Sequence, residues 1–285
     1  MNRMTMGDMP RALDASYPAT VYLNDEAILV CGECHAPLQV EIWLKASDGT
    51  IGRGQRVRCM CKCEAGANAM QVHAKQQQAF MERMNRLRAE FGVDQSSWDK
   101  TFEADDGTHG DVAKTCKVYV DAWQEMLRTN QGILLYGPPG TGKTYFAYSI
   151  ANALAAQQVP AIIANLPYLI GKMQAYGDNG PLLDKIRRYP LLVIDDLGVE
   201  RSTPVACEHV YSIINARCES RKPTIITTNL PLSQITSSTD DTHIRIYDRV
   251  MEMCSIRLPV TGKSRRNADA KRREGEAIKI MEGYE

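Results

Sequence analysis

Eight consecutive residues of this 285-residue chain match a pattern that binds phosphate groups. Residues 137–144 read G-P-P-G-T-G-K-T and satisfy G-x-x-x-x-G-K-[S/T] at every position. The glycines let backbone N–H groups curl around phosphate oxygens, and a helix that starts after them adds its positive dipole. Lys143 can reach the β and γ phosphates of a nucleoside triphosphate, and the Thr144 hydroxyl can bind Mg²⁺. The predicted contacts to ATP come from Gly137, Pro138, Pro139, Gly140, Thr141, Gly142, Lys143, Thr144 and Tyr145.

Two further polar positions end apolar stretches of strand type. Asp195 and Asp196 follow the run Leu191–Ile194, about 50 residues after the phosphate-binding pattern. Alone, such a run indicates a strand with a solvated end. After the phosphate pattern it predicts that Asp195 binds Mg²⁺, directly or through water, and that Asp196 orients or deprotonates the attacking water. Asn229 follows the run Thr224–Thr228, where it either helps to place the water or only forms a turn.

Five of the nine cysteines fall between residues 31 and 63. They form two groups, Cys31-Gly-Glu-Cys34 and Cys59-Met-Cys61-Lys-Cys63, separated by a predicted hairpin. In a reducing compartment this clustering favours metal ligation over disulfides, and four thiolates form a closed structural zinc site. The five cysteines compete for four places, and His35 is a sixth candidate. The other four cysteines, at positions 116, 207, 218 and 254, are expected to be buried apolar residues.

The elements that must position these residues alternate between strands and helices. Buried strands are predicted at 132–136, 161–165, 191–195 and 224–228, and enough chain for a crossover helix separates each from the next. The predicted fold class is therefore α/β with a parallel sheet, in a domain of residues 93–285. Residues 112–127 are expected to form one helix before the first of these strands, and residues 66–92 favour a helical linker. Residues 1–65 form a small cysteine-rich head.

The composition excludes some classes of protein. The chain is 44% hydrophobic and 24% charged, which is ordinary for a globular protein, and its formal net charge is zero. Overall basicity therefore gives no indication of nucleic-acid binding. No apolar run is long enough for a membrane span, and the first ten residues lack the apolar core of a signal peptide. We therefore expect a cytoplasmic protein with no membrane partner.

Three segments together resemble bacterial and phage replicative-helicase loaders of the DnaC/DnaI kind, to which the IstB-like ATPases of insertion sequences are closely related. The segments are Gly137–Thr144, Val193–Gly198 and Thr227–Asn229, and the resemblance extends from about residue 98 to about residue 266. It implies an AAA+ P-loop ATPase core. Asp196 stands where most AAA+ proteins carry glutamate, and its shorter reach implies slow hydrolysis that suits a switch.

The same resemblance implies roles for residues that spacing alone does not assign. Asn229 matches sensor 1, and Arg249 matches the arginine finger that acts on the nucleotide of a neighbouring subunit. Arg266 matches sensor 2, with Arg265 as the alternative. The implied catalytic set is Lys143, Asp195, Asp196, Asn229, Arg249 and Arg266.

The head also fits the loader family. Cys61-Lys62-Cys63-Glu64 resembles the family's second cysteine cluster, which selects Cys31, Cys34, Cys61 and Cys63 as zinc ligands, with Cys59 as the first replacement. The resemblance implies that the head docks a DnaB-type replicative helicase. The AAA+ domains would self-associate around ATP and deliver the helicase to single-stranded DNA.

Two other functions compete with this interpretation. An IstB-like ATPase would assist a transposase on duplex DNA, but proteins of that kind generally lack a cysteine head. A zinc adaptor with a vestigial nucleotide site is disfavoured by the intact Lys143, Thr144, Asp195 and Asn229. Contact with DNA has the least support, because acidic residues interleave the basic residues after position 261.

Overall fold

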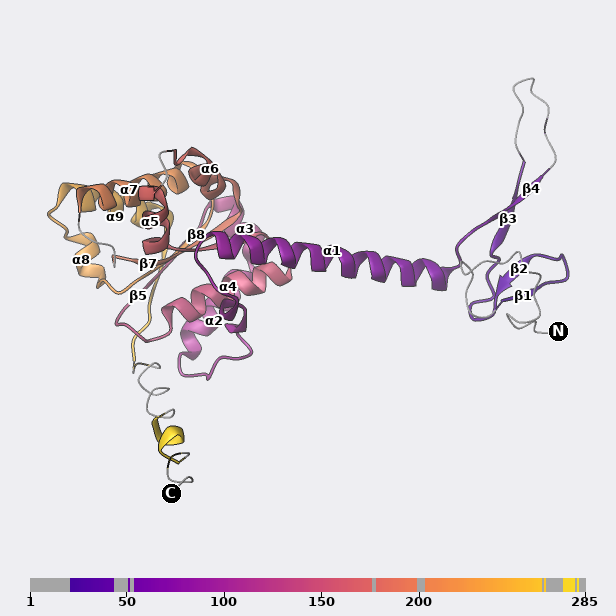
Figure 1. The fold of residues 1–285 in the computed structure, drawn as a ribbon, viewed down its shortest axis with the longest axis horizontal. Helices are drawn as coiled ribbons and strands as arrows, with labels where there is room; N and C mark the ends of the chain where they lie inside the picture. The colour runs from indigo at the N-terminus through magenta and orange to yellow at the C-terminus, as the bar shows by residue number, and fades with distance from the viewer. Residues whose placement is uncertain are drawn as a thin grey trace. The chain divides into compact units, whose positions relative to one another are not determined.

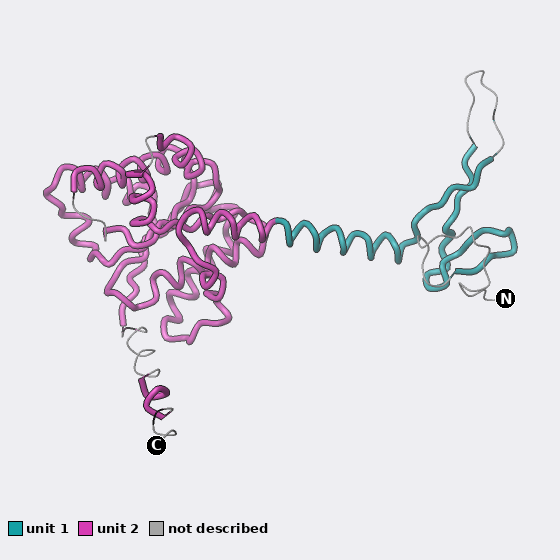
Figure 2. The backbone as a smooth tube through the Cα atoms, viewed as in Figure 1, with its two compact units in different colours: residues 1–79 teal, residues 80–285 magenta. Residues whose placement is uncertain are grey.

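A computed structural model describes residues 21–43, 51, 54–175, 178–198, 203–262, 264, 274–279 and 281. The chain divides into two compact units, residues 1–79 and residues 80–285 (Figure 2). Helix α1 (Lys62–Glu90) crosses the boundary between them (Figure 1). Among the described helices, none combines the length and apolarity needed to cross a bilayer. The clustered cysteines belong to the first unit and the phosphate-binding segment to the second.

Two short antiparallel hairpins build the described part of the first unit. Strand β1 (Val21–Leu23) pairs with β2 (Leu29–Cys31), and β3 (Gln39–Ile42) pairs with β4 (Gln55–Arg58). Asn24 closes the first turn, where its Oδ1 accepts hydrogen bonds from the backbone N–H groups of residues 26 and 28. The buried core consists of Val21, Leu29, Cys31, Leu38 and Cys61. A core this small buries too little apolar surface to stabilise a unit without a further element.

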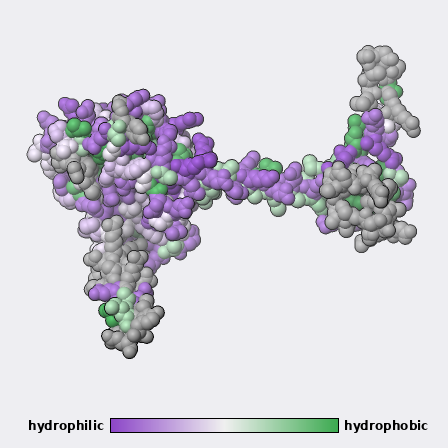
Figure 3. All heavy atoms as spheres, in the orientation of Figure 1, coloured by the Kyte–Doolittle hydropathy of each residue, from purple (hydrophilic) through white to green (hydrophobic). Residues whose placement is uncertain are grey.

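Helix α1 changes character along its length. Its sequence is rich in alanine, glutamine, methionine and arginine, which favour helix. Residues 65–79 are all exposed, and the surface of this segment is mostly hydrophilic (Figure 3). From residue 80 the chain belongs to the second unit, where Met84 and the following Phe91 are buried and Leu87 packs against the core. One stripe of apolar residues thus fastens the last turns of the helix.

A five-stranded parallel sheet forms the centre of the second unit, in the order β6-β7-β8-β5-β9. The strands are β5 (Ile133–Tyr136), β6 (Ala161–Asn165), β7 (Leu191–Leu197), β8 (Thr224–Thr228) and β9 (Ile256–Pro259). Parallel strands end at the same edge of a sheet, so the segments after β5, β7 and β8 meet there. The α/β fold class with a parallel sheet is confirmed.

Helices cover both faces of this sheet (Figure 1). One face carries α2 (Gly110–Asp121), α3 (Trp123–Thr129) and α4 (Lys143–Ala156), beside the 3₁₀ helix η2 (Gln95–Asp99). The other carries α5 (Leu166–Ala175), α6 (Gly180–Arg188), α7 (Pro204–Glu219), α8 (Leu232–Thr236) and α9 (Asp241–Met253). Ile133 and Leu135 pack toward the first group and Leu134 toward the second, as strand alternation requires. Because both faces are covered, the central strands are apolar along most of their length.

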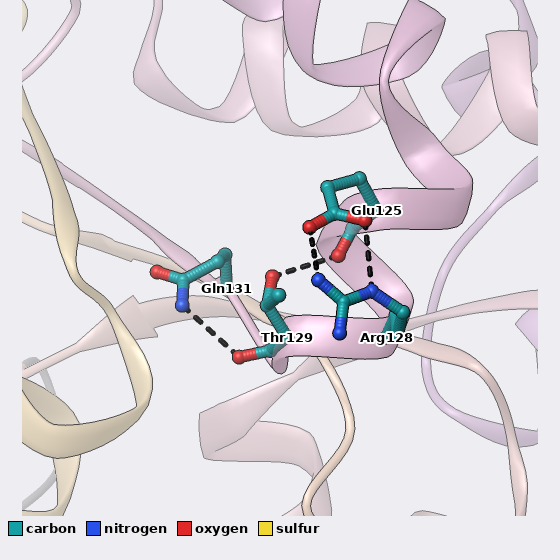
Figure 4. A network of polar contacts seen from close by, with 4 residues as sticks. All are labelled: Glu125, Arg128, Thr129 and Gln131. Carbon is teal, nitrogen blue, oxygen red and sulfur yellow. Dashed lines mark hydrogen bonds and ion pairs between the residues drawn. The ribbon is translucent and has the colours of Figure 1, made fainter.

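A polar network connects α3 to β5 (Figure 4). Arg128 Nε donates to Glu125 Oε2 at 2.9 Å, and Thr129 Oγ1 donates to the backbone oxygen of Glu125 at 2.7 Å. Gln131 Nε2 donates to the backbone oxygen of Thr129 at 3.0 Å. Between them, Asn130 adopts a left-handed φ of 54° and ends the helix. The network thus lies between α3 and β5, the strand that leads into the phosphate-binding loop.

Two features of the second unit differ from the sequence-based expectation. Strand β9 was not predicted, because it has only four residues, alternates between half-buried and exposed positions, and ends at a proline at the edge of the sheet. The single helix expected at 112–127 is divided between α2 and α3, which meet at Ala122. Tyr119 and Trp123 lie on either side of this break and pack together, with ring centroids 6.2 Å apart.

Candidate nucleotide and metal sites

The phosphate-binding pattern forms the loop between β5 and α4. Gly140 and Gly142 have left-handed φ angles of 80° and 105°, which other residues rarely adopt. A side chain at Gly140 would also collide with the hydroxyl of Ser264. Thr141 is buried, and its Oγ1 donates to the backbone oxygen of Pro138 at 2.9 Å. The tight loop and the start of α4 directly after it provide the backbone geometry that a bound phosphate requires.

Lys143 lies inside this loop and is nearly buried. Its Nζ donates to the backbone oxygens of Gly137 and Pro138 at 2.9 and 2.7 Å. The ammonium charge is therefore close to the first turn of α4, where the helix dipole is also positive. Charge and dipole together favour an anion in the loop, so these residues fit the phosphates of a nucleotide.

The carboxylate of Asp195, at the end of β7, accepts hydrogen bonds from three hydroxyl groups. Thr144 Oγ1 donates to Oδ1 at 2.9 Å, and Thr227 Oγ1 donates to the same oxygen at 2.6 Å. Tyr148 OH donates to Oδ2 at 3.2 Å. The nearly buried carboxylate and the Thr144 hydroxyl offer two adjacent oxygen donors, the ligand type that Mg²⁺ prefers. This donor set fits Mg²⁺ held between the protein and a bound nucleotide.

Asp196 and Asn229 lie at the same edge of the sheet. Asp196 has a left-handed φ of 65°, and the pairing of β7 with β8 shifts its register between Ile194 and Leu197. A positive φ at a non-glycine residue is strained, and such strain is concentrated at functional sites. Asn229 directly follows β8 and is exposed. The roles of both residues toward a water molecule stay predictions.

Thr227 is a site residue that the sequence analysis did not identify. Its hydroxyl donates to Asp195 Oδ1, and it accepts a hydrogen bond from the backbone N–H of Asp196 at 3.0 Å. One threonine therefore connects both acidic positions of β7 to β8. Its place in the T-T-N segment before Asn229 was the available signal, but a threonine in a buried strand also matches ordinary strand propensity.

A cavity of about 400 Å³ beside the loop was also not predicted. It is lined by residues 108–112, 115, 258, 259 and 261. The intervening Val260 packs against Gly137, where an added Cβ would meet the Val260 backbone oxygen. His109 Nε2 is buried without a hydrogen-bond partner among the described residues, and the His109 ring lies edge-on to Phe146 of α4. The volume is typical of small-molecule sites, so this cavity is a candidate ligand pocket beside the loop.

Arg249 lies away from the loop of its own chain. Its Nη1 donates to Glu252 Oε2 at 2.9 Å, and the side chain is 43% exposed. The end of α9 is joined to the start of β5, because the backbone N–H of Gly132 donates to the oxygen of Met253 at 2.9 Å. This is the amino edge of the sheet, opposite the loop, and the role of Arg249 as an arginine finger stays a prediction. The sensor 2 candidates, Arg266 and Arg265, lie outside the described residues.

Four cysteine sulfurs come together in the first unit. The Sγ atoms of Cys31, Cys34, Cys61 and Cys63 all lie within 4.8 Å of one another. Tetrahedral zinc places its sulfur ligands about 3.8 Å apart, from Zn–S bonds of about 2.3 Å, so the cluster needs only a small contraction. The other two candidates are not part of it. Cys59 donates to the backbone oxygen of residue 37 at 3.3 Å, and His35 Nδ1 pairs with the hydroxyl of Tyr22 at 3.1 Å.

The clustered thiols shift one another's pKa values in opposite directions. The pKa of Cys34 falls to about 6, chiefly because the backbone N–H of Ala36 donates to its sulfur. The pKa of Cys63 rises to about 12, chiefly because its thiol hydrogen-bonds to Cys34. Sulfurs this close cannot all lose their protons unless a cation compensates their charges. Four thiols in a compact cluster therefore fit Zn²⁺, which stays a prediction.

Comparisons with known proteins agree with this arrangement. Residues 66–273 match the family model of IstB-like ATP binding proteins. A putative ATP-binding protein of insertion sequence IS1162 from Pseudomonas fluorescens is 31% identical over 112 residues, which are 38% of this chain and 48% of that protein. The replicative helicase loader DnaC of Escherichia coli (strain K12) is 28% identical over 141 residues, 45% and 56% of the two chains. The replicative helicase loader DnaI of Bacillus subtilis (strain 168) is 29% identical over 103 residues, 35% and 33% of the two chains. The chain spans about half the length of the first curated relatives it matches.

Solved structures show the same fold. The crystal structure of the DnaC helicase loader superposes with a TM-score of 0.51 at 23% identity, over 59% of this chain and 100% of that chain. The crystal structure of DnaI gives a TM-score of 0.51 at 24% identity, over 61% and 94% of the two chains. At these identities the likeness concerns the AAA+ fold alone, and it confirms the fold expected from the three motif segments. Together with the family match over most of its length, this shows that the chain belongs to the family of IstB-like ATP binding proteins.

Proposed function

We propose that this protein is an Mg²⁺-dependent ATPase that loads a DnaB-type replicative helicase onto single-stranded DNA in the cytoplasm. Lys143 and the loop N–H groups hold the phosphates, and Thr144 and Asp195 hold the metal ion. Bound Mg²⁺ would neutralise charge on the β and γ phosphates. Asp196 and Asn229 orient the attacking water at the carboxyl edge of the sheet. The shorter reach of Asp196, compared with glutamate, favours slow hydrolysis that suits a switch.

The main support for the loader proposal is that the candidate metal site and the candidate nucleotide site belong to different compact units. The cysteine cluster belongs to residues 1–79, whereas the phosphate loop, Asp195 and Asn229 belong to residues 80–285. An exposed helical segment, residues 65–79, joins them along the chain. One unit can then bind a partner protein while the other binds and hydrolyses ATP. The relatives DnaC and DnaI are named as replicative helicase loaders, which supports a helicase as that partner.

Two further parts complete the proposal. Zn²⁺ bound by the four clustered thiolates would contribute folding free energy that the small core of the first unit lacks. The AAA+ domains would associate so that Arg249 of one subunit stabilises charge on the nucleotide of the next. The position of Arg249 at the edge of the sheet opposite its own loop supports a role in trans.

A second candidate is an ATPase that assists a transposase on duplex DNA. The family model and two of the similar relatives favour it, since those relatives are ATP-binding proteins of insertion sequences. The cysteine cluster favours the loader, because IstB-like transposition ATPases generally lack a cysteine head.

The test compares two cysteine substitutions in the full-length chain with a purified DnaB-type helicase. Cys34→Ser removes a cluster member, and Cys59→Ser removes a neighbouring cysteine that lies outside the cluster. We expect the wild-type chain and Cys59→Ser to hold about one Zn²⁺ per chain and to co-elute with the helicase in size-exclusion chromatography. Cys34→Ser should lose the metal and the co-elution, yet still bind ATP.

Two results would contradict this assignment. If zinc-free Cys34→Ser still co-elutes with the helicase, the cysteine cluster is not required for docking. The second candidate would be established instead if the wild-type chain does not co-elute with the helicase, but binds duplex DNA in the presence of ATP and stimulates a transposase.

A further inference from the structure

The phenol of Tyr148 is a buried group to which the proposed ATPase chemistry assigns no role. Tyr148 lies on α4 four residues after Thr144, so both side chains share one face of the helix. The residue is only 6% exposed, and its ring belongs to the core between α4 and the sheet. The described hydrogen bond of its hydroxyl goes to a distant side chain. The hydroxyl donates to Asp195 Oδ2 at 3.2 Å, across 47 positions of sequence.

The three hydroxyl donors on Asp195 are divided unequally between its two oxygens. Thr144 and Thr227 both donate to Oδ1, whereas Tyr148 alone donates to Oδ2. A carboxylate offers about four lone-pair positions, so about one remains for a metal ion or for water bound to it. Donors on both oxygens also hold the carboxylate against rotation. Without the phenol, the described hydrogen bonds would restrain only one of the two oxygens.

Residues 100 and 101 contact the ring of Tyr148 and neighbouring residues of α4. Lys100 Nζ lies 4.5 Å from the ring centroid, and the Lys100 backbone oxygen accepts a hydrogen bond from Asn152, one turn further along α4, at 2.8 Å. On the other side, Tyr145 OH donates to the backbone oxygen of Thr101 at 2.6 Å. A phenol with an ordinary pKa of about 10 is protonated at neutral pH, so the hydroxyl remains a donor. A fixed ring with a permanent donor can orient the carboxylate that it contacts.

We infer that Tyr148 is a positioning residue for Mg²⁺, which orients the Asp195 carboxylate and does not itself touch the ion or the nucleotide. The inference rests on the proposed function, because it requires that Thr144 and Asp195 hold the ion. Removing the hydrogen-bond partner of a metal ligand typically lowers metal affinity by about 10- to 100-fold. Since Thr144 and Thr227 still restrain Oδ1, the lower end of that range is expected for loss of Tyr148 alone.

Tyr148→Phe in the full-length chain tests this, because it keeps the ring and removes only the hydroxyl. A fluorescent ATP analogue is titrated in EDTA and again at increasing Mg²⁺ concentration. Affinity in EDTA should stay within about twofold of wild type, whereas the Mg²⁺ concentration for half-maximal tightening should rise about tenfold. The matched control is Tyr119→Phe, which removes a buried hydroxyl that donates to the backbone oxygen of Gln131 at 2.7 Å. We expect Tyr119→Phe to respond to Mg²⁺ as the wild-type chain does.

Three outcomes in the variants would overturn the inference. The first is wild-type Mg²⁺ dependence in Tyr148→Phe. The second is an equal loss of affinity with and without Mg²⁺, and the third is the same shift in Tyr119→Phe, since either would indicate general loosening of the fold. If the affinity of the wild-type chain for the ATP analogue does not change with Mg²⁺ concentration, both the proposed metal site and this inference are wrong. A normal wild-type response combined with an unchanged Tyr148→Phe would overturn this inference alone.

Discussion

Single residues at the candidate nucleotide site show how buried charges are accommodated before any ligand binds. Lys143 and Asp195 are both nearly buried, and a buried charge is costly unless polar groups surround it. Backbone oxygens of the loop accept hydrogen bonds from Lys143, and three hydroxyl groups donate to Asp195. Backbone carbonyl oxygens and hydroxyl groups thus offset part of the cost of burying these two charges.

At this scale the first prediction concerns Lys143. Lys143→Ala removes a phosphate-facing charge, so we expect steady-state ATP hydrolysis to fall to background, while a cooperative thermal unfolding transition shows that the variant still folds. Lys114→Ala, at an exposed position of α2, is the control and should hydrolyse ATP normally. Hydrolysis by Lys143→Ala at the wild-type rate would contradict the assignment of the loop.

At the amino edge of the sheet, Arg217 of α7 connects several elements through hydrogen bonds. It is fully buried and donates to the backbone oxygens of residues 186, 189, 190 and 223, and to Thr224 Oγ1. These contacts join the last turn of α6 to the chain that enters β7 and β8. Burial lowers the pKa of Arg217 to about 9, so the guanidinium still carries its charge at neutral pH. One side chain thus connects α6 and α7 to the start of β7 and β8, the two strands whose carboxyl ends carry Asp195 and Thr227.

The second prediction follows from this connection. Arg217→Met leaves several buried carbonyl oxygens without a donor, and we expect a loss of about 3 kcal/mol or more in the free energy of unfolding, measured by urea denaturation. The control is Arg128→Met. Arg128 is 71% exposed, and its one ion-pair partner among the described residues is Glu125, one turn away, so its loss should leave the unfolding midpoint nearly unchanged. Equal midpoints for the two variants would show that Arg217 does not hold these elements together.

For the whole molecule, the position of Arg249 makes assembly part of the proposed chemistry. If Arg249 acts across a subunit interface, its loss removes a group that hydrolysis needs but ATP binding does not. We therefore expect Arg249→Ala to retain ATP binding and to lose hydrolysis. Arg245→Ala, one turn earlier on α9 and exposed, is the control and should stay active.

Mixing experiments test the same point more sharply. Arg249→Ala and Lys143→Ala are each expected to be inactive alone, but their mixture should recover part of the hydrolysis rate. At a shared interface one subunit supplies the intact loop and the other supplies the arginine. If mixed assembly is shown by cross-linking and no activity returns, Arg249 does not act across the interface.

Much of this protein was determined by local patterns in its sequence. The phosphate loop is contiguous, and four strands of the sheet are apolar runs with turns after them, so both could be predicted without knowledge of the fold. Strand β9 could not, because a short edge strand that is buried on one side only lacks such a run. From the residues alone, six candidates for four zinc positions also stayed open, and only the resemblance to loaders chose among them. The structure brings those four sulfurs together while Cys59 and His35 bond elsewhere.

The tertiary structure alone decided which groups meet Asp195. Thr144, Tyr148 and Thr227 lie 51, 47 and 32 positions from it, and no spacing rule connects them. They meet because β8 pairs beside β7 and because α4 packs across the sheet, which brings two hydroxyls from one helix face to a single carboxylate. Strand order and register arise from the packing of the whole sheet, so contacts that depend on them cannot be found in any one segment of the chain.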